Sequence, residues 1–138
     1  MTQQIQFSVM GKPVAKSRPR FWNGRAVTDP KTREAEQRLL VYYKQAARGR
    51  KPYTGSITVE MVFIFTPPKS WPAKKQADAI AQSWPHTKRP DIDNLVKLLD
   101  GLNGYAWVDD SQIANVRATK QYGIVDKTEI TIIFEMEQ

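Results

Sequence analysis

Residues 88–113 of this chain read KRPDIDNLVKLLDGLNGYAWVDDSQI and hold five of its fourteen acidic residues. Two basic residues and a proline precede the first of these acids. When residues 91–104 are placed on a helix, the apolar side chains fall at positions i, i+3, i+4, i+7 and i+10 and form one stripe. The stretch therefore predicts an amphipathic helix that packs on a core and carries carboxylates where it begins.

A second face of this helix brings charged side chains together. Lys97 follows Asp93 by four residues, which places both on the same side of a helix. Asp91 lies at the helix start, where its side chain is free to turn toward Asp93. The loop that follows can add Asp109 or Asp110. We therefore expect three carboxylates and a lysine to face a common space.

Carboxylates gathered in this way need a cation. Two of them about 5 Å apart repel by roughly 3 kcal/mol at an effective dielectric of about 20, and a helix N-terminus returns only about 0.3–1 kcal/mol per charge. Mg²⁺ prefers carboxylate oxygens together with water and substrate phosphate, and Mn²⁺ can substitute for it. Zinc is a poor alternative because the chain has one histidine and no cysteine. The expected metal ligands are therefore Asp91, Asp93 and one loop aspartate.

Phosphodiester hydrolysis uses the chemistry that such a site supplies. The metal polarises a phosphoryl oxygen and activates water. Lys97 can stabilise the extra negative charge of the transition state or orient the attacking water. The motif D-x-D-N-x2-K followed by D-D therefore indicates a metal-dependent nuclease.

Each member of the cluster also has an ordinary structural explanation. Asp91 can be a plain N-cap. Asp93 and Lys97 can form an exposed ion pair worth about 0.2–0.5 kcal/mol. Asp100 is expected to pair with Lys97 or to remain solvated. Only one of the two adjacent loop acids is expected to point inward.

Composition sets bounds on the class of protein. With 138 residues the chain is long enough for one domain, which we expect to span residues 1–138. It lacks cysteine, a signal-like N-terminus and any apolar run of the roughly 20 residues that a membrane helix needs, so we expect a cytoplasmic protein without membrane contact. The net charge of +7 favours an anionic partner. Nucleic acid is preferred over a membrane surface because no basic amphipathic helix with an aromatic face is present.

The rest of the chain predicts an α+β fold. Residues 57–65 are β-branched and aromatic, and the last half is apolar on both faces, so this strand should lie in the centre of a sheet. Residues 113–122 and 128–136 are expected to pair as an antiparallel hairpin. Further elements are expected at residues 4–10 (a strand), 20–27 (a hairpin with the turn Asn23-Gly24), 30–48 (a helix capped by Asp29) and 70–82 (a short helix capped by Ser70). We predict a single domain with a mixed, mostly antiparallel sheet, two main helices and one short helix.

Two segments rich in lysine and arginine, residues 12–25 and 66–89, precede the acidic stretch. Cations in such segments neutralise DNA phosphates. In the first segment, Phe21 and Trp22 either stack on nucleic acid or pack in the core. The candidate DNA-binding residues are Lys12, Lys16, Arg18, Arg20, Lys69, Lys88 and Arg89.

These motifs resemble those of a known family. The run KRPDIDNLVKLLDGLNG followed by WVDDSQI is similar to the signature of the RusA-type Holliday junction resolvases, and the upstream KPVAKSRPR and FTPPKSW resemble members of phage or prophage type. The resemblance touches most of the chain, and residues 88–113 carry its specific part. It implies an α+β homodimer, called RusA-like here, that depends on Mg²⁺ and makes paired nicks across a four-way DNA junction.

The resemblance also assigns the site. It implies that Asp91, Asp93 and Asp110 are the essential carboxylates and metal ligands, and that Lys97 is needed for catalysis. It alone selects Asp110 over Asp109. The expected function is resolution of four-way (Holliday) junctions by paired symmetric cleavage. The alternatives are a non-catalytic protein that binds branched DNA and a nuclease for flaps or forks.

Overall fold

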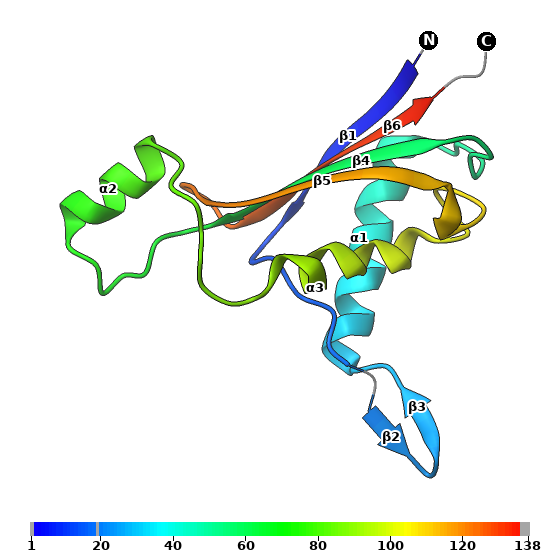
Figure 1. Cartoon of the computed structure of the whole chain (residues 1–138), viewed down its shortest axis with the longest axis horizontal. Coiled ribbons are helices and arrows are strands. Elements are labelled where there is room, and N and C mark those ends of the chain that lie inside the picture. Colours follow the sequence, from blue (N-terminus) through cyan, green and yellow to red (C-terminus); the bar gives the residue numbers. More distant parts are fainter. Residues whose placement is uncertain (1, 19, 136–138) are drawn as a thin grey trace.

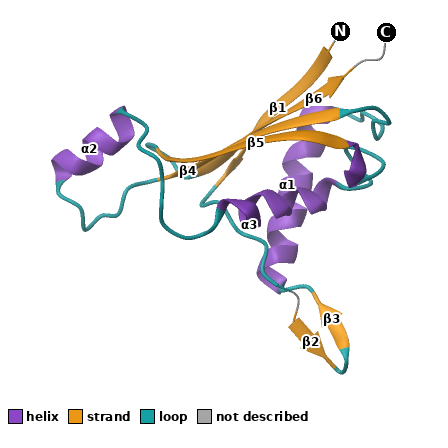
Figure 2. Ribbon diagram, viewed as in Figure 1, coloured by secondary structure: helices purple, strands orange, loops and turns teal. Residues whose placement is uncertain are grey.

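The computed structural model of the chain describes residues 2–18 and 20–135. Helices and strands form a mixed α+β fold (Figures 1 and 2). The elements are β1 (Thr2–Met10), β2 (Arg20–Trp22), β3 (Arg25–Val27), α1 (Pro30–Ala47), β4 (Ile57–Phe65), α2 (Ala73–Ala81), α3 (Ile92–Val96), the 3₁₀ helices η1 (Lys97–Leu102) and η2 (Asp110–Gln112), β5 (Ile113–Tyr122) and β6 (Lys127–Glu135).

Four strands form the main sheet in the order β1-β6-β4-β5. β6 runs antiparallel to both of its neighbours, whereas β5 runs parallel to β4. The predicted class, with its mixed and mostly antiparallel sheet, is confirmed. β4 lies inside the sheet, as its apolar composition indicated.

The predicted hairpin between the last two strands is wrong, because β4 lies between β5 and β6. The short connection between them passes over the end of β4: Gly123 N donates to Phe65 O at 2.9 Å, and Thr66 N donates to Asp126 Oδ1 at 2.6 Å. A Cβ at Gly123 would lie 2.4 Å from Ile64 Cγ2, so only glycine allows the chain to cross this closely. The apolar end of β4 is thereby covered along both edges.

The core lies between the sheet and two helical segments. Leu39 and Tyr43 of α1 join one buried cluster with Leu95, Leu99 and Leu102 from the segment 92–102 and with the buried face of β4. Figure 1 shows α1 and α3 crossing on one side of the sheet. Burial of this apolar stripe positions the acidic stretch.

The predicted helix over residues 91–104 forms in two parts. After Val96 the α-helix tightens into the 3₁₀ helix η1, which ends at Leu102. A 3₁₀ helix has three residues per turn, so Leu99 and Leu102 stack above one another and are both buried. The apolar stripe is therefore kept over these positions, whereas Ile92 at its start is 38% exposed.

Local capping signals in the sequence had different outcomes. Asp29 caps α1 by accepting a hydrogen bond from Lys31 N at 2.9 Å, as predicted. The proposed cap at Ser70 is wrong: α2 begins at Ala73 with Pro72 in the N-cap position and has no side-chain cap. Pro72 has extended backbone angles (φ −54°, ψ 147°), which delays the first helical turn.

The predicted hairpin over residues 20–27 is confirmed and extends away from the sheet beyond the start of α1 (Figure 1). Asn23 and Gly24 both have positive φ, as the type I′ turn requires. Phe21 and Trp22 are 79% and 72% exposed. The interpretation that these rings pack in the core is therefore wrong.

Within the described residues, no helix has the length and apolar character needed to cross a membrane.

Candidate active site

The first two acids of the motif stand at the start of α3. Asp91 occupies the N-cap position, but its side chain makes no capping hydrogen bond. Asp93 lies in the first turn, and both side chains are exposed. The plain N-cap explanation of Asp91 therefore does not describe this structure, and its carboxylate remains available to an external ligand.

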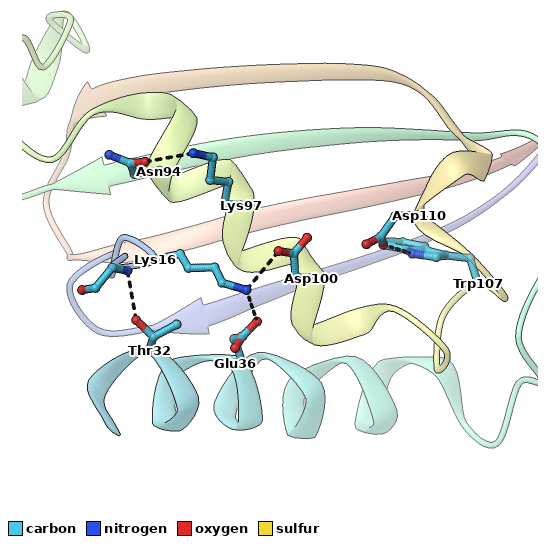
Figure 3. A network of polar contacts seen from close by, with 9 residues as sticks. Lys16, Thr32, Glu36, Asn94, Lys97, Asp100, Trp107 and Asp110 are labelled. Carbon is cyan, nitrogen blue, oxygen red and sulfur yellow. Dashed lines mark hydrogen bonds and ion pairs between the residues drawn. The ribbon is translucent and has the colours of Figure 1, made fainter. Parts of the chain in front are cut away.

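Lys97 lies at the point where α3 passes into η1 (Figure 3). Its Nζ donates to Asn94 Oδ1 at 3.5 Å. Among the described residues, no ion pair joins it to Asp93 or to Asp100. Lys97 N donates to Asp93 O, so this turn is still α-helical and the two side chains share a face without pairing. The alternative of an exposed ion pair between Asp93 and Lys97 therefore does not describe this structure, and the Lys97 ammonium is exposed.

Asp100 is tied to a different lysine. Its Oδ2 accepts from Lys16 Nζ at 3.0 Å, and Lys16 also pairs with Glu36 of α1 at 3.4 Å (Figure 3). Partial burial alone would lower the pKa of Lys16, but the hydrogen bond and charge of Asp100 and the charge of Glu36 outweigh it and raise this pKa. Lys16 was expected to bind DNA. In this structure its ammonium forms two ion pairs that link the segment before the hairpin to α1 and to η1.

The two adjacent loop acids have different tasks. Asp109 caps η2: its side chain accepts from Ser111 N at 3.0 Å, while Gln112 Oε1 accepts from Asp109 N at 2.9 Å. The hydrogen bonds from Ser111 lower the pKa of Asp109. Asp110 is half-buried, and its Oδ1 accepts from Nε1–H of the fully buried Trp107 at 2.8 Å (Figure 3). The structure therefore orients Asp110 from the core and uses Asp109 for the turn.

Lys120 of β5 holds the segment that leads into the motif. Its Nζ donates to Lys88 O at 2.6 Å and to Pro90 O at 2.7 Å, directly before Asp91. Its own carbonyl accepts from His86 N at 3.1 Å. The sequence did not single out this residue, because a lysine near the end of an alternating strand has no local signal that it will reach the loop before α3.

His86 is the buried member of the same loop. Its ring is 8% exposed, stacks on Phe65 with 4.0 Å between centroids, and contacts Tyr122. Burial lowers the pKa of His86, and the nearby charge of Lys120 lowers it further. The residue was expected to be a loop residue and not a metal ligand; it lies in a loop, but as part of the core.

The other candidate DNA-binding side chains are placed on the surface. The exposed ones are Lys12, Arg18, Lys69, Lys88 and Arg89, and the Arg20 side chain lies outside the described residues. Exposed cations can reach phosphates without breaking internal contacts.

The acids offer the right donor chemistry for Mg²⁺, but their arrangement is open. In residues 2–18 and 20–135, no three or more His, Cys, Asp or Glu side chains form a group that could hold a metal ion. Asp110 is therefore not gathered with Asp91 and Asp93 into a closed three-carboxylate site. Mg²⁺ is usually held by one or two carboxylates plus water and substrate phosphate, and the adjacent pair Asp91 and Asp93 fits that requirement.

Comparison with known proteins decides the family. The family model described as Endodeoxyribonuclease RusA matches residues 10–133. The chain belongs to the RusA endodeoxyribonuclease family. It is also 31% identical over 135 residues to the uncharacterized protein YqaN of Bacillus subtilis (strain 168), covering 93% of this chain and 94% of the relative. The RusA match includes the whole acidic stretch and the hairpin β2–β3 before α1.

We predict that Lys120→Met slows DNA cleavage by about ten- to a hundredfold, because a loosened segment 88–90 misplaces Asp91. Lys120→Arg should retain most of the rate, since it can still donate to both carbonyls. Arg117→Met, an exposed cation on the same strand, is the control. The measurement is the single-turnover rate with saturating enzyme. An Lys120→Met rate equal to that of the control would show that this contact has no part in the site.

We also predict that folding is sensitive to mild acid. The pKa of His86 is lower in the folded state than its ordinary value of 6.5, so the unfolded chain binds the proton more readily. The free energy of unfolding should therefore fall as the pH drops below about 6.5. His86→Phe keeps the ring on Phe65 and should flatten this dependence. Urea unfolding at pH 7.5 and 5.5 measures it, and parallel losses in both proteins would contradict the role of His86.

Proposed function

We propose that this chain is a divalent-metal-dependent endodeoxyribonuclease that resolves four-way DNA junctions by paired symmetric cleavage, acting as a homodimer. Mg²⁺ is the expected metal, with Mn²⁺ as a substitute. The four-way junction as substrate, the divalent metal and the homodimer are proposed in addition to membership of the RusA family. We also propose that the protein acts in the cytoplasm, together with its DNA substrate.

One observation carries the proposal. Asp91, Asp93 and Asp110 have no ion-pair partner among the described residues, although the chain has 21 Lys and Arg and a net charge of +7. Asp100, in the same stretch, is paired with Lys16. Of these, Asp91 and Asp93 stand at the start of α3, directly after the exposed Lys88 and Arg89, and are suited to bind a metal ion and phosphate together.

Each residue has a distinct task in this proposal. Asp91 and Asp93, at the start of α3, would hold the metal, and Asp110, held by Trp107, would join them as a third ligand once metal and DNA are bound. When bound, a divalent cation polarises the phosphoryl oxygen, activates water and steadies the leaving oxygen. Lys97, exposed one turn after the acids, would stabilise the negative charge that develops on the phosphoryl group. The contact of Lys97 with Asn94 keeps its ammonium beside that helix start.

Affinity would come from phosphate contacts and symmetry from the dimer. Lys12, Arg18, Lys69, Lys88 and Arg89 are exposed and can each neutralise a phosphate. If Z phosphates are contacted on duplex arms, log affinity should fall with log salt with a slope of about −0.9Z. Two symmetric nicks require two sites related by a two-fold axis, which a homodimer supplies.

The test is a substrate panel: a four-way junction, a flap, a fork and a linear duplex, each with Mg²⁺ or with chelator. We expect paired symmetric nicks on the junction in Mg²⁺ alone. Flap or fork cleavage that exceeded junction cleavage would replace the proposed substrate. Binding of branched DNA without any cleavage in Mg²⁺ or Mn²⁺ would favour a non-catalytic protein.

Asp93→Asn tests the site in the same panel. Cleavage should fall at least about a hundredfold, because the variant loses a charged contact to the metal. Junction binding should be kept or tightened, since one negative charge beside the phosphates is removed. Glu34→Gln, an exposed acid on α1, is the control. A normal cleavage rate in Asp93→Asn would show that the acids of α3 are not the site.

A further inference from the structure

We propose that the hairpin β2–β3 stacks its exposed aromatic rings on bases that lose their neighbours at the branch point of DNA. This inference rests on the proposed function and deepens it, because it names the part of a branched substrate that the protein recognises. It concerns Phe21 and Trp22, which have no place in the chemistry described above.

The hairpin buries none of its described side chains. Phe21 and Trp22 in β2, the turn residues Asn23 and Gly24, and all of β3 are exposed. The two strands pair with each other through Arg20↔Val27, Phe21↔Ala26 and Trp22↔Arg25. Successive residues of a strand face opposite sides, so one ring lies on each face of the ribbon. Isolated two-stranded hairpins are marginally stable in water. Because both rings are exposed in this structure, they can gain burial only from a partner.

The charge of the segment identifies the class of partner. Residues 11–28 contain five Lys or Arg and no Asp or Glu. Arg25 is the cross-strand neighbour of Trp22, so a cation stands beside a ring. A flat π-system with adjacent cations matches a base and its phosphate, and base–aromatic stacking tolerates any sequence. Together with membership of the RusA endodeoxyribonuclease family, these features favour nucleic acid over a membrane or a protein partner.

The hairpin is fixed to the site at its base. Lys16 N donates to Asn94 O of α3 at 2.9 Å, and Ser17 N donates to Thr32 Oγ1 of α1 at 3.0 Å. Thr32 is fully buried. The other strand of the hairpin leads directly into the capped start of α1 at Asp29. The rings are therefore carried on a ribbon whose root touches the helix that bears the acids.

Reach and geometry favour a branch point over an intact duplex. Six residue steps lead from Ser17 to the tip at Asn23, and a segment of this length spans at most roughly 20 Å. The major groove of DNA is about 8.5 Å deep, so the tip can pass the backbone of a helix held at the acids. Inside a duplex both faces of each base are already stacked. A branch point exposes base faces, so the rings can stack there without first breaking a base pair.

The experiment compares affinities for a four-way junction and for a linear duplex of the same sequence, in chelator so that no cleavage occurs. Phe21→Ala/Trp22→Ala should lose at least about fivefold in junction affinity and much less in duplex affinity, given the usual contribution of base stacking. Phe21→Tyr/Trp22→Phe should recover most of the loss. Ile124→Ala removes an apolar side chain with the same 79% exposure as Phe21 and should leave both affinities unchanged.

Three results would overturn the inference. Equal losses on junction and duplex would show that the hairpin binds the backbone or a groove. Unchanged junction affinity would show that the rings do not contact DNA. A change of sedimentation coefficient in the alanine variant without DNA would show that the rings pack against a second copy. Wild-type protein that neither bound nor cut junctions would instead remove the proposed function itself, so the two failures can be told apart.

Discussion

β5 lies parallel to β4 at the edge of the sheet, and two parallel strands cannot be joined by a tight turn. The connection between them spans residues 66–112 and contains α2, the loop with His86, α3, η1 and η2. All of the candidate site acids lie in this one crossover. β5 then returns beside it, so that Lys120 binds the carbonyls in front of Asp91. The position of the acids thus depends on a strand pairing that forms outside the acidic stretch.

The same constraint explains which features the sequence could predict. The Asn23-Gly24 turn, the Asp29 cap and the apolar stripe of the acidic helix each depend on residues close together in the chain; the first two are confirmed, and the stripe is confirmed from Leu95 onward. The pairing of β5 is not local. Two alternating strands joined by a short turn normally form a hairpin, and the sequence gives no direct sign that Gly123 lets the chain step over β4.

The acidic stretch shows how far helical spacing can predict side-chain contacts within a single element. Helical spacing placed Asp93 beside Lys97, but the Lys97 side chain donates to Asn94 instead. The tightening of the helix after Val96 was not predicted either, because it depends on how Leu99 and Leu102 fit into the core. The pairing of Asp100 with Lys16 joins residues 84 positions apart in the chain, so local spacing could not predict it either. What the sequence did supply is the set of acids and the boundary at which the helix begins.

Separate substitutions of Asp109 and Asp110 test most directly which of the two loop acids takes part in DNA cleavage. Asparagine is as good an N-cap as aspartate, so Asp109→Asn should preserve η2 and cleave four-way junctions within about twofold of the wild-type rate. Asp110→Asn can still accept from Trp107 but loses its charge, and its single-turnover cleavage should fall at least about a hundredfold. Full activity in Asp110→Asn, or an equal loss in both variants, would contradict the assignment of these two residues.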